Sequence, residues 1–189
     1  MNLKRTVAVV LIGVAGVLPT MGALASDGHD ASPTLVQTVR DATRDFRDVS
    51  NATDYTSLGA CVSGPQEGAM GIHYANGTLI GDGAVDGNKP ELLIYEQRNG
   101  RLRLVGVEFL VLAAQWNDPA TGHVPGAPVL QGQLFNYVSA PNRYGLDAFY
   151  ELHVWAWRDN PNGTFADFNP AVSCVEYAGE GMSGMNHGA

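Results

Sequence analysis

The chain has 189 residues, of which 45% are hydrophobic, and a formal net charge of −8. An acidic chain repels the phosphate backbone of nucleic acids and anionic lipid headgroups, so we expect neither as a partner. The length suits a single domain with a sizeable core, because domains usually contain roughly 50 to 250 residues.

The N-terminus has the three zones of a secretory signal peptide. Residues 4–5 are basic, residues 7–18 form an uncharged apolar run, and residues 23–25 are an Ala-Leu-Ala cleavage box. The apolar run is shorter than the roughly 20 residues that a membrane span needs, which makes an uncleaved anchor the weaker alternative. We therefore expect residues 1–25 to be removed, leaving a periplasmic or secreted chain that begins at Ser26 with a net charge of −8 − 2 = −10.

The two cysteines are Cys61 and Cys174, which lie 174 − 61 = 113 positions apart. An even number of cysteines in an exported chain is typical of a disulfide, which we expect here. Free thiols or a metal-binding pair are the alternatives, but no Cys-x-x-Cys spacing favours metal. Residues 26–177 are expected to form the one globular domain, and the small residues of 178–189 a flexible tail.

A helix is expected at the start of this domain. Ser32 can cap it, and Pro33 fits its first turn. Apolar residues then recur at spacings of 4, 3, 4 and 3, which predicts an amphipathic helix with one buried stripe. The stripe consists of Leu35, Val39, Ala42, Phe46 and Val49.

Strands and glycine-rich loops follow the helix. Asn99-Gly100 lies between two apolar runs, which is the strongest short-range signal for a β-hairpin. A helix followed by antiparallel strands predicts the α+β class, with the N-terminal helix packed on a curved antiparallel sheet or a partly closed barrel. The expected strands are residues 56–62, 69–75, 91–96, 102–112, 148–158 and 171–177.

A two-residue turn fixes the register of the hairpin and puts Tyr95 on the face that carries Glu91 and Glu108. Glu108 lies in an apolar run, where a carboxylate is costly unless it is paired, hydrogen-bonded or neutralised. A cation, a shared proton, an arginine or a local opening to water would compensate. A bulge would shift the register and remove the Glu91–Glu108 pairing. The expected pairs are Arg98–Arg101, Gln97–Leu102, Glu96–Arg103, Tyr95–Leu104, Leu93–Gly106 and Glu91–Glu108.

The strand around His153 alternates between two kinds of side chain. Its even positions, 150 to 156, are plain core residues, whereas its odd positions place Glu151 and His153 on one face with Trp155 and Trp157. Large aromatic side chains with a few converging polar groups are typical of ligand pockets. They are also typical of an aromatic core with one hydrogen-bonded histidine.

His73 lies in another apolar strand and extends this set. His73, Glu108 and His153 suffice for a metal site with three protein ligands and an open position, and a divalent metal, zinc or copper, is the one cofactor that the sequence suggests. The same groups could serve acid–base catalysis, with His153 as the base and Glu108 as the acid. The residues expected to line the ligand site are Tyr95, Glu91 and Trp155.

Short motifs exclude several enzyme classes. The chain has no Gly-x-Ser-x-Gly elbow, no phosphate-binding Gly-x-x-x-x-Gly-Lys and no dinucleotide fingerprint. In the tail, Met182, Met185 and His187 could hold copper, although a flexible segment of small residues explains them as well.

Several short segments carry a resemblance to other proteins. They are residues 61–65 (CVSGP), 70–74 (MGIHY), 90–91 (PE), 95–96 (YE), 107–109 (VEF), 153–157 (HVWAW), 169–170 (NP) and 172–174 (VSC). With these segments the chain resembles an uncharacterised group of exported bacterial proteins. The resemblance covers most of the mature chain. It implies a bacterial origin and a periplasmic or secreted location, and it implies nothing about mechanism.

Three functions follow as hypotheses. The first is an exported protein that binds a small ligand or a metal ion in a sheet-lined cavity, with His73, Glu108 and His153 at its centre. The second is a small-molecule enzyme, either metal-assisted or free of cofactor. The third is a structural or interaction protein without a small-molecule site, which a filled interior beside His153 would favour.

Overall fold

The computed structural model describes residues 34–179 and 181–182. The predicted signal peptide, the predicted cap Ser32 and the predicted copper ligands Met185 and His187 lie outside the described residues. The helices are α1 (Leu35–Thr43), α2 (Gly77–Ile80) and α3 (Ala113–Trp116), with 3-10 turns at Asp45–Arg47, Val49–Asn51 and Pro119–Thr121. The strands are β1 (Thr56–Ser63), β2 (Ala69–Ala75), β3 (Leu92–Arg98), β4 (Arg101–Leu112), β5 (Val129–Leu130), β6 (Gln133–Leu134), β7 (Asn136–Val138), β8 (Phe149–Val154) and β9 (Gly181–Met182).

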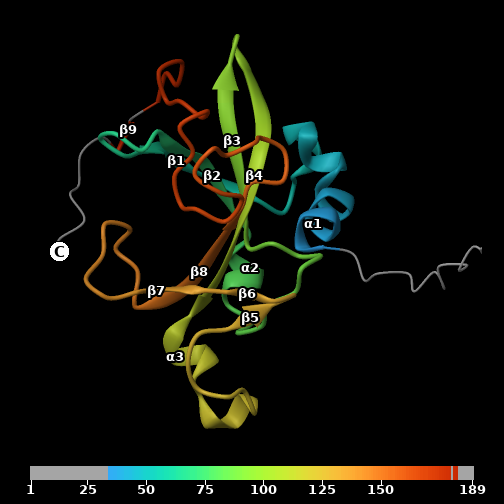
Figure 1. Ribbon diagram of the computed structural model, residues 1–189, viewed down its shortest axis with the longest axis vertical. Coiled ribbons are helices and arrows are strands. Elements are labelled where there is room, and N and C mark those ends of the chain that lie inside the picture. Colours follow the sequence, from blue (N-terminus) through green and yellow to red (C-terminus); the bar gives the residue numbers. More distant parts are fainter. Residues whose placement is uncertain (1–33, 180, 183–189) are drawn as a thin grey trace, which may run out of the picture. The chain divides into compact units, whose positions relative to one another are not determined.

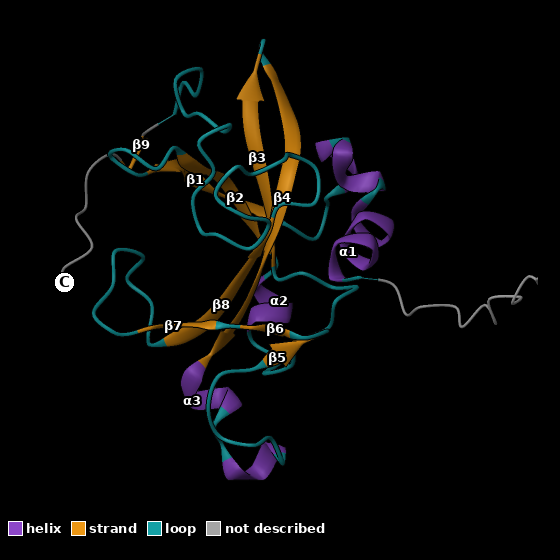
Figure 2. Ribbon diagram, in the orientation of Figure 1, coloured by secondary structure: helices purple, strands orange, loops and turns teal. Residues whose placement is uncertain are grey.

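One sheet dominates the domain (Figures 1 and 2). It has seven strands in the order β7-β8-β4-β3-β2-β1-β9, and β5 and β6 form a separate two-stranded sheet. All neighbours in the large sheet are antiparallel except β9, which pairs with β1 in parallel. The expected α+β class with an antiparallel sheet is therefore confirmed. Among the described residues β7 and β9 are the two edges, so the sheet is open and does not close into a barrel.

Helix α1 is shorter than its apolar stripe predicts. Thr34 caps it through a capping box with Gln37, and Leu35 and Val39 are buried in the main core. The helix ends at Thr43, whose buried hydroxyl donates to the Val39 carbonyl at 2.7 Å, a side-chain bond of the kind that weakens and bends helices. The last two stripe residues lie beyond this point, in the 3-10 turns.

The two faces of the sheet carry different interiors. The main core lies on one face and includes Leu93 and Tyr95 of β3 with Val107 and Phe109 of β4. Two smaller apolar clusters lie on the other face, one of them around Trp155. Buried ionisable side chains also lie on this second face, which therefore carries the candidate site. The members of the smaller clusters are Ala69, Ile94, Val105, Trp155 and Val172 in one, and Leu92, Leu110 and Phe149 in the other.

A bulge in the β3–β4 hairpin decides which face Glu108 occupies. The predicted register is confirmed from Arg98–Arg101 to Tyr95–Leu104, and it shifts by one residue between Ile94 and Tyr95. The predicted pairs Leu93–Gly106 and Glu91–Glu108 are therefore wrong. Leu93 instead faces Val107, and Glu108 faces Leu92. The shift moves Glu108 to the face opposite Tyr95.

Two predicted strands need correction. β8 ends at Val154 and not at Arg158. Directly after it the Trp155 N–H donates outside the ladder, to the Thr164 carbonyl at 3.0 Å, and the chain meets β4 again through the Trp157 N–H, which donates to the Val105 carbonyl at 3.1 Å. Residues 171–177 form a loop, although Val172 is buried. Its apolar residues anchor that loop on the sheet and pair with no strand, which is why their pattern was misleading.

The predicted disulfide between Cys61 and Cys174 is confirmed. It joins β1 to the loop that follows β8. No helix among the described residues is long and apolar enough to span a bilayer.

Candidate functional site

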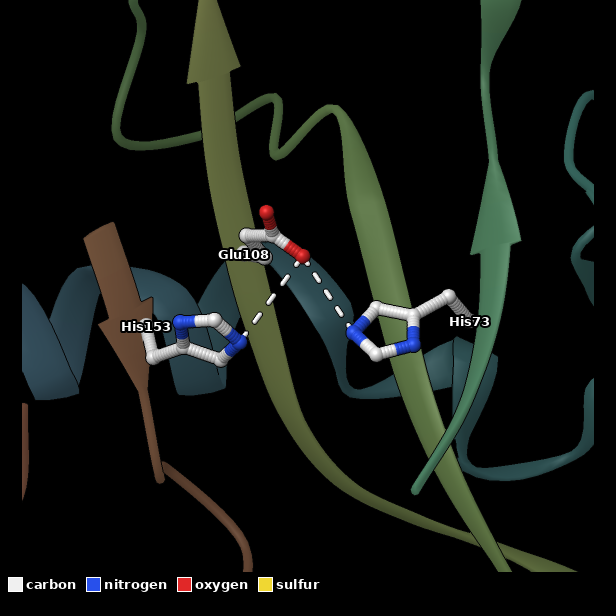
Figure 3. A group of neighbouring side chains, drawn as sticks. All are labelled: His73, Glu108 and His153. Carbon is white, nitrogen blue, oxygen red and sulfur yellow. Dashed lines mark ion pairs between the residues drawn. The ribbon is translucent and has the colours of Figure 1, made fainter. Parts of the chain in front are cut away.

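Three strands bring the predicted metal ligands together. His73 is on β2, Glu108 on β4 and His153 on β8, and Glu108 pairs directly with His153 across the β4–β8 ladder. β3 separates β2 from β4, so the His73 side chain reaches across it. Figure 3 shows the Glu108 carboxylate facing both imidazole rings.

The distances in this cluster suit a metal centre. Glu108 Oε2 lies 3.3 Å from His73 Nε2 and 3.8 Å from His153 Nε2. One ligand atom from each of the three residues lies within 4.8 Å of the others. Tetrahedral coordination with bonds of about 2.0 to 2.2 Å separates the ligand atoms by about 3.3 to 3.6 Å. A cation therefore fits between these atoms after only small movements.

Burial keeps both imidazoles uncharged. The exposed fractions are 6% for His73 and 1% for His153. Burial lowers the pKa of His73 to about 4 and the pKa of His153 to about 3, because the charged form loses its hydration. The contacts with Glu108 are thus not ion pairs at neutral pH. Neutral imidazole is the form that coordinates metals.

A second carboxyl group, that of Glu151, contacts Glu108. Both residues are buried, and burial raises the pKa of each above the usual glutamate range. Their side chains are hydrogen-bonded, with the protonated Glu151 carboxyl donating to Glu108. Two carboxyl groups this close cannot both ionise easily, so the pair retains a proton at neutral pH. A shared proton was one of the expected ways to compensate Glu108.

Among the described residues His153 has no hydrogen-bond partner at either ring nitrogen, although both atoms are fully buried. Its Nδ1 lies 3.7 Å from Asp167 Oδ1, which also accepts a hydrogen bond of 3.2 Å from the Asn136 amide. A buried imidazole without a partner is costly, so the arrangement calls for a group that satisfies it.

A pocket of about 320 Å³ opens beside the cluster. Its lining includes the polar side chains of His73 and Glu108, together with Tyr144 and Leu146 from the loop before β8. This volume lies at the lower end of the range for small-molecule sites, roughly 300 to 1,000 Å³. The remaining lining is mainly apolar and consists of Leu58, Ala60, Val62, Leu92, Leu110 and Phe149.

The three residues predicted to line the ligand site, Tyr95, Glu91 and Trp155, lie in three different surroundings. Tyr95 belongs to the main core on the opposite face, and its hydroxyl donates to the Phe46 carbonyl at 2.7 Å, so the expectation that it lines the site is corrected. Glu91 is buried and accepts a hydrogen bond of 3.1 Å from the Leu110 N–H, outside the pocket lining. Trp155 stacks beside His153 with 6.3 Å between ring centroids.

Sequence reasoning missed two residues of the cluster. Glu151 was assigned to the face of His153 but not to the site, although that alternation was a sufficient signal. Asp167 lies in the loop after β8, where no periodic pattern could place it. The loop residue Tyr144 was missed for the same reason.

No protein-family model matches the chain, and no curated protein or solved structure is similar to it at a significant level. The resemblance to exported bacterial proteins therefore stays a prediction.

Proposed function

We propose that this protein binds a divalent transition-metal ion, zinc or copper, through His73, Glu108 and His153. The observation that carries the proposal is the convergence of two neutral, buried imidazoles on one buried carboxylate from three separate strands. Imidazole and carboxylate ligands suit both metals. Ligands on strands are also held more firmly than ligands on loops, which favours a defined coordination geometry.

The pocket suggests what the metal serves. Three protein ligands would leave one coordination position open, and two of these ligands, His73 and Glu108, line the pocket. The leucine and phenylalanine side chains of the pocket favour a small, mostly apolar molecule. One oxygen, nitrogen or sulfur atom of such a ligand would occupy the open position.

The disulfide supports the predicted export, because such bonds persist in oxidising compartments. A periplasmic or secreted protein of this kind would bind its metal and its ligand outside the cytoplasm. The pocket beside the cluster argues against the hypothesis of a structural protein without a small-molecule site.

A second candidate is metal-free acid–base catalysis, favoured by the exposure of Glu108 and His73 to the pocket. His153 is 1% exposed and does not line the pocket, so His73 and not His153 would meet a substrate. Glu108 would then exchange a proton with the substrate, and His153 would only position the Glu108 carboxyl group.

Isothermal titration calorimetry of the purified metal-free protein with Zn²⁺ and with Cu²⁺ tests the metal proposal. We expect wild-type protein to bind, and His73→Ala and His153→Ala each to weaken binding by more than about 100-fold, because changes outside the ligands alone cost 10- to 100-fold. Glu108→Gln, which keeps the side-chain shape, should weaken binding in a folded protein.

The matched control is His123→Ala. His123 stacks on Trp116 at 3.7 Å between ring centroids and lies outside the cluster, so its loss should leave metal affinity unchanged. Equal affinity in wild type and all three cluster variants would overturn the metal proposal and leave acid–base chemistry as the better account.

A further inference from the structure

Each of the two ring nitrogens of His153 faces a carboxyl group. Its Nε2 lies 3.8 Å from Glu108 Oε2, and its Nδ1 lies 3.7 Å from Asp167 Oδ1. Both nitrogens are buried, and neither has a hydrogen-bond partner within the part of the chain that the structure describes. If a metal ion binds Nε2, the Nδ1 side of the same ring still has no partner.

His153 also belongs to a second set of possible ligands, in which Asp167 faces its Nδ1 atom. Glu151, His153 and Asp167 each offer one ligand atom, and these atoms lie within 4.8 Å of one another. β7 supports this set, because Asn136 pairs with Glu151 in the sheet and its amide donates to Asp167. The Asp167 side chain is 36% exposed, which gives an ion access from solvent, whereas Glu151 is buried.

We propose that His153 bridges two divalent metal ions. One ion is bound by Nε2 together with His73 and Glu108, and the other by Nδ1 together with Glu151 and Asp167. This inference rests on the proposed function, because the first ion is the one described there.

The charges of the cluster fit two ions. Bridging requires the imidazole of His153 to release its N–H proton to solvent, which leaves one negative charge on the ring. The three carboxylates of Glu108, Glu151 and Asp167 supply three more. These four negative charges equal the positive charge of two divalent cations.

Loading both ions also separates Glu108 from Glu151. The proton that they share is released to solvent, and each carboxylate then turns to its own ion. Dinuclear zinc and copper centres with nitrogen and oxygen ligands are chemically ordinary for these metals.

Metal content after dialysis against Zn²⁺ tests this arrangement. We expect two zinc ions per wild-type chain and one in Asp167→Asn or Glu151→Gln. Asp159→Asn is the matched control, because Asp159 is an exposed aspartate on the same loop, and it should retain two.

Electron paramagnetic resonance of the copper-loaded protein tests the bridge itself. Two Cu²⁺ ions joined through an imidazolate couple antiferromagnetically, so wild type should give less signal at low temperature than its copper content predicts. Asp167→Asn, with one isolated ion, should give the full signal. A full signal in wild type loaded with two copper ions would overturn the bridge.

The outcomes separate the two proposals. One zinc ion in wild type, unchanged in Asp167→Asn, would overturn the bridging role and leave the first metal centre intact. Asp167 would then only orient His153. No bound metal in wild type would overturn both proposals.

Discussion

Glu91 stands where the β3–β4 ladder ends, and its carboxyl group replaces a missing strand partner. The preceding residue is Pro90, whose carbonyl accepts a hydrogen bond from Tyr55. The Leu110 N–H therefore has no strand partner on that side and donates to the Glu91 carboxyl. Burial is the main reason that the pKa of Glu91 rises to about 8.

The pKa of Glu91 makes the stability of the metal-free protein depend on pH. Its pKa is about 8 in the folded protein and about 4.5 in the unfolded chain, so the folded state binds the proton more tightly. The stabilisation is complete below pH 4.5 and is lost as the pH rises through 8. Between pH 7 and 8.5 we expect the free energy of unfolding to fall, with a contribution from Glu91 of about 1 kcal/mol.

Urea denaturation of Glu91→Gln at the two pH values measures this contribution. Glutamine keeps an acceptor for the Leu110 N–H but does not titrate, so the variant should lose less stability than wild type between pH 7 and 8.5. Glu67→Gln, at an exposed glutamate, is the control and should behave as wild type does. An unchanged pH dependence in Glu91→Gln would contradict the assignment.

Single residues on apolar strands were the part of the site that the sequence could predict. His73, Glu108 and His153 are conspicuous because a polar group in a buried strand needs a partner. The identity of the partners was not accessible, since Asp167 reaches His153 through a loop whose path depends on tertiary contacts. Glu151 was visible in the alternation, but nothing in one strand shows which neighbour on the next strand it meets.

Among the elements, the bulge of the β3–β4 hairpin has the largest effect on the site. Gly106 lies within it, and a Cβ atom there would be 2.9 Å from the Val154 carbonyl oxygen and 3.3 Å from the Trp155 ring. The chain thus approaches β8 closely just beyond the pair of Glu108 and His153.

We expect Gly106→Ala to be destabilising. The added methyl group meets backbone that cannot move without shifting the end of β8, and overpacking of this kind costs about 1 to 3 kcal/mol. The displaced strand end would also move His153, so metal affinity should fall with stability. Urea denaturation and zinc titration of the variant measure both effects.

Gly77→Ala is the matched control for that substitution. No atom of residues 34–179 and 181–182 lies within 4 Å of a Cβ placed on Gly77, which begins α2, so alanine there should be neutral or slightly stabilising. If the two variants unfold at the same urea concentration, the close approach of β8 to Gly106 does not affect the free energy of unfolding.

Turn chemistry and alternation predicted the elements well near the hairpin turn and less well away from it. Asn99-Gly100 fixes the first four pairs, because the turn sets the register of its immediate neighbours. The bulge arises farther along, where packing against β8 competes with regular pairing. The predicted helix is longer than α1 for a related reason. The apolar period continues into 3-10 turns, which a spacing rule does not distinguish from helix.

At the scale of the whole molecule, the disulfide is the main covalent constraint. It joins Cys61 and Cys174 across 113 positions, and the loop that it anchors carries Asp167. In the chain-entropy model, closing a loop of this length stabilises the fold by about 4 to 5 kcal/mol.

We therefore expect the double variant Cys61→Ala/Cys174→Ala to lose about 4 kcal/mol of unfolding free energy relative to the oxidised wild type. Urea denaturation with and without a reducing agent measures this loss. Wild type should weaken on reduction to the level of the double variant, and the double variant should not respond to the reductant. Equal stability of oxidised wild type and double variant would contradict the expected contribution.

The α+β class and the disulfide were predictable from composition and order of elements, because each follows from a property of the whole chain. The order of strands was not predictable from the sequence, because it depends on which edge of the β2–β3–β4 strands pairs with β1 and which with β8. That order brings β2 and β8, eighty residues apart in the chain, to either side of β3 and β4.

The bulge also limits how this hairpin can change in evolution. Successive side chains of a strand point to opposite faces of the sheet. Inserting or deleting one residue between Gly106 and Glu108 would therefore turn the Glu108 carboxylate into the main core, which packs against α1. Length changes there are tolerable only in pairs, and the same holds at the Asn99-Gly100 turn, which sets the register of the first pairs. Homologues that keep Glu108 should therefore share the parity of this short segment even where its amino acids differ.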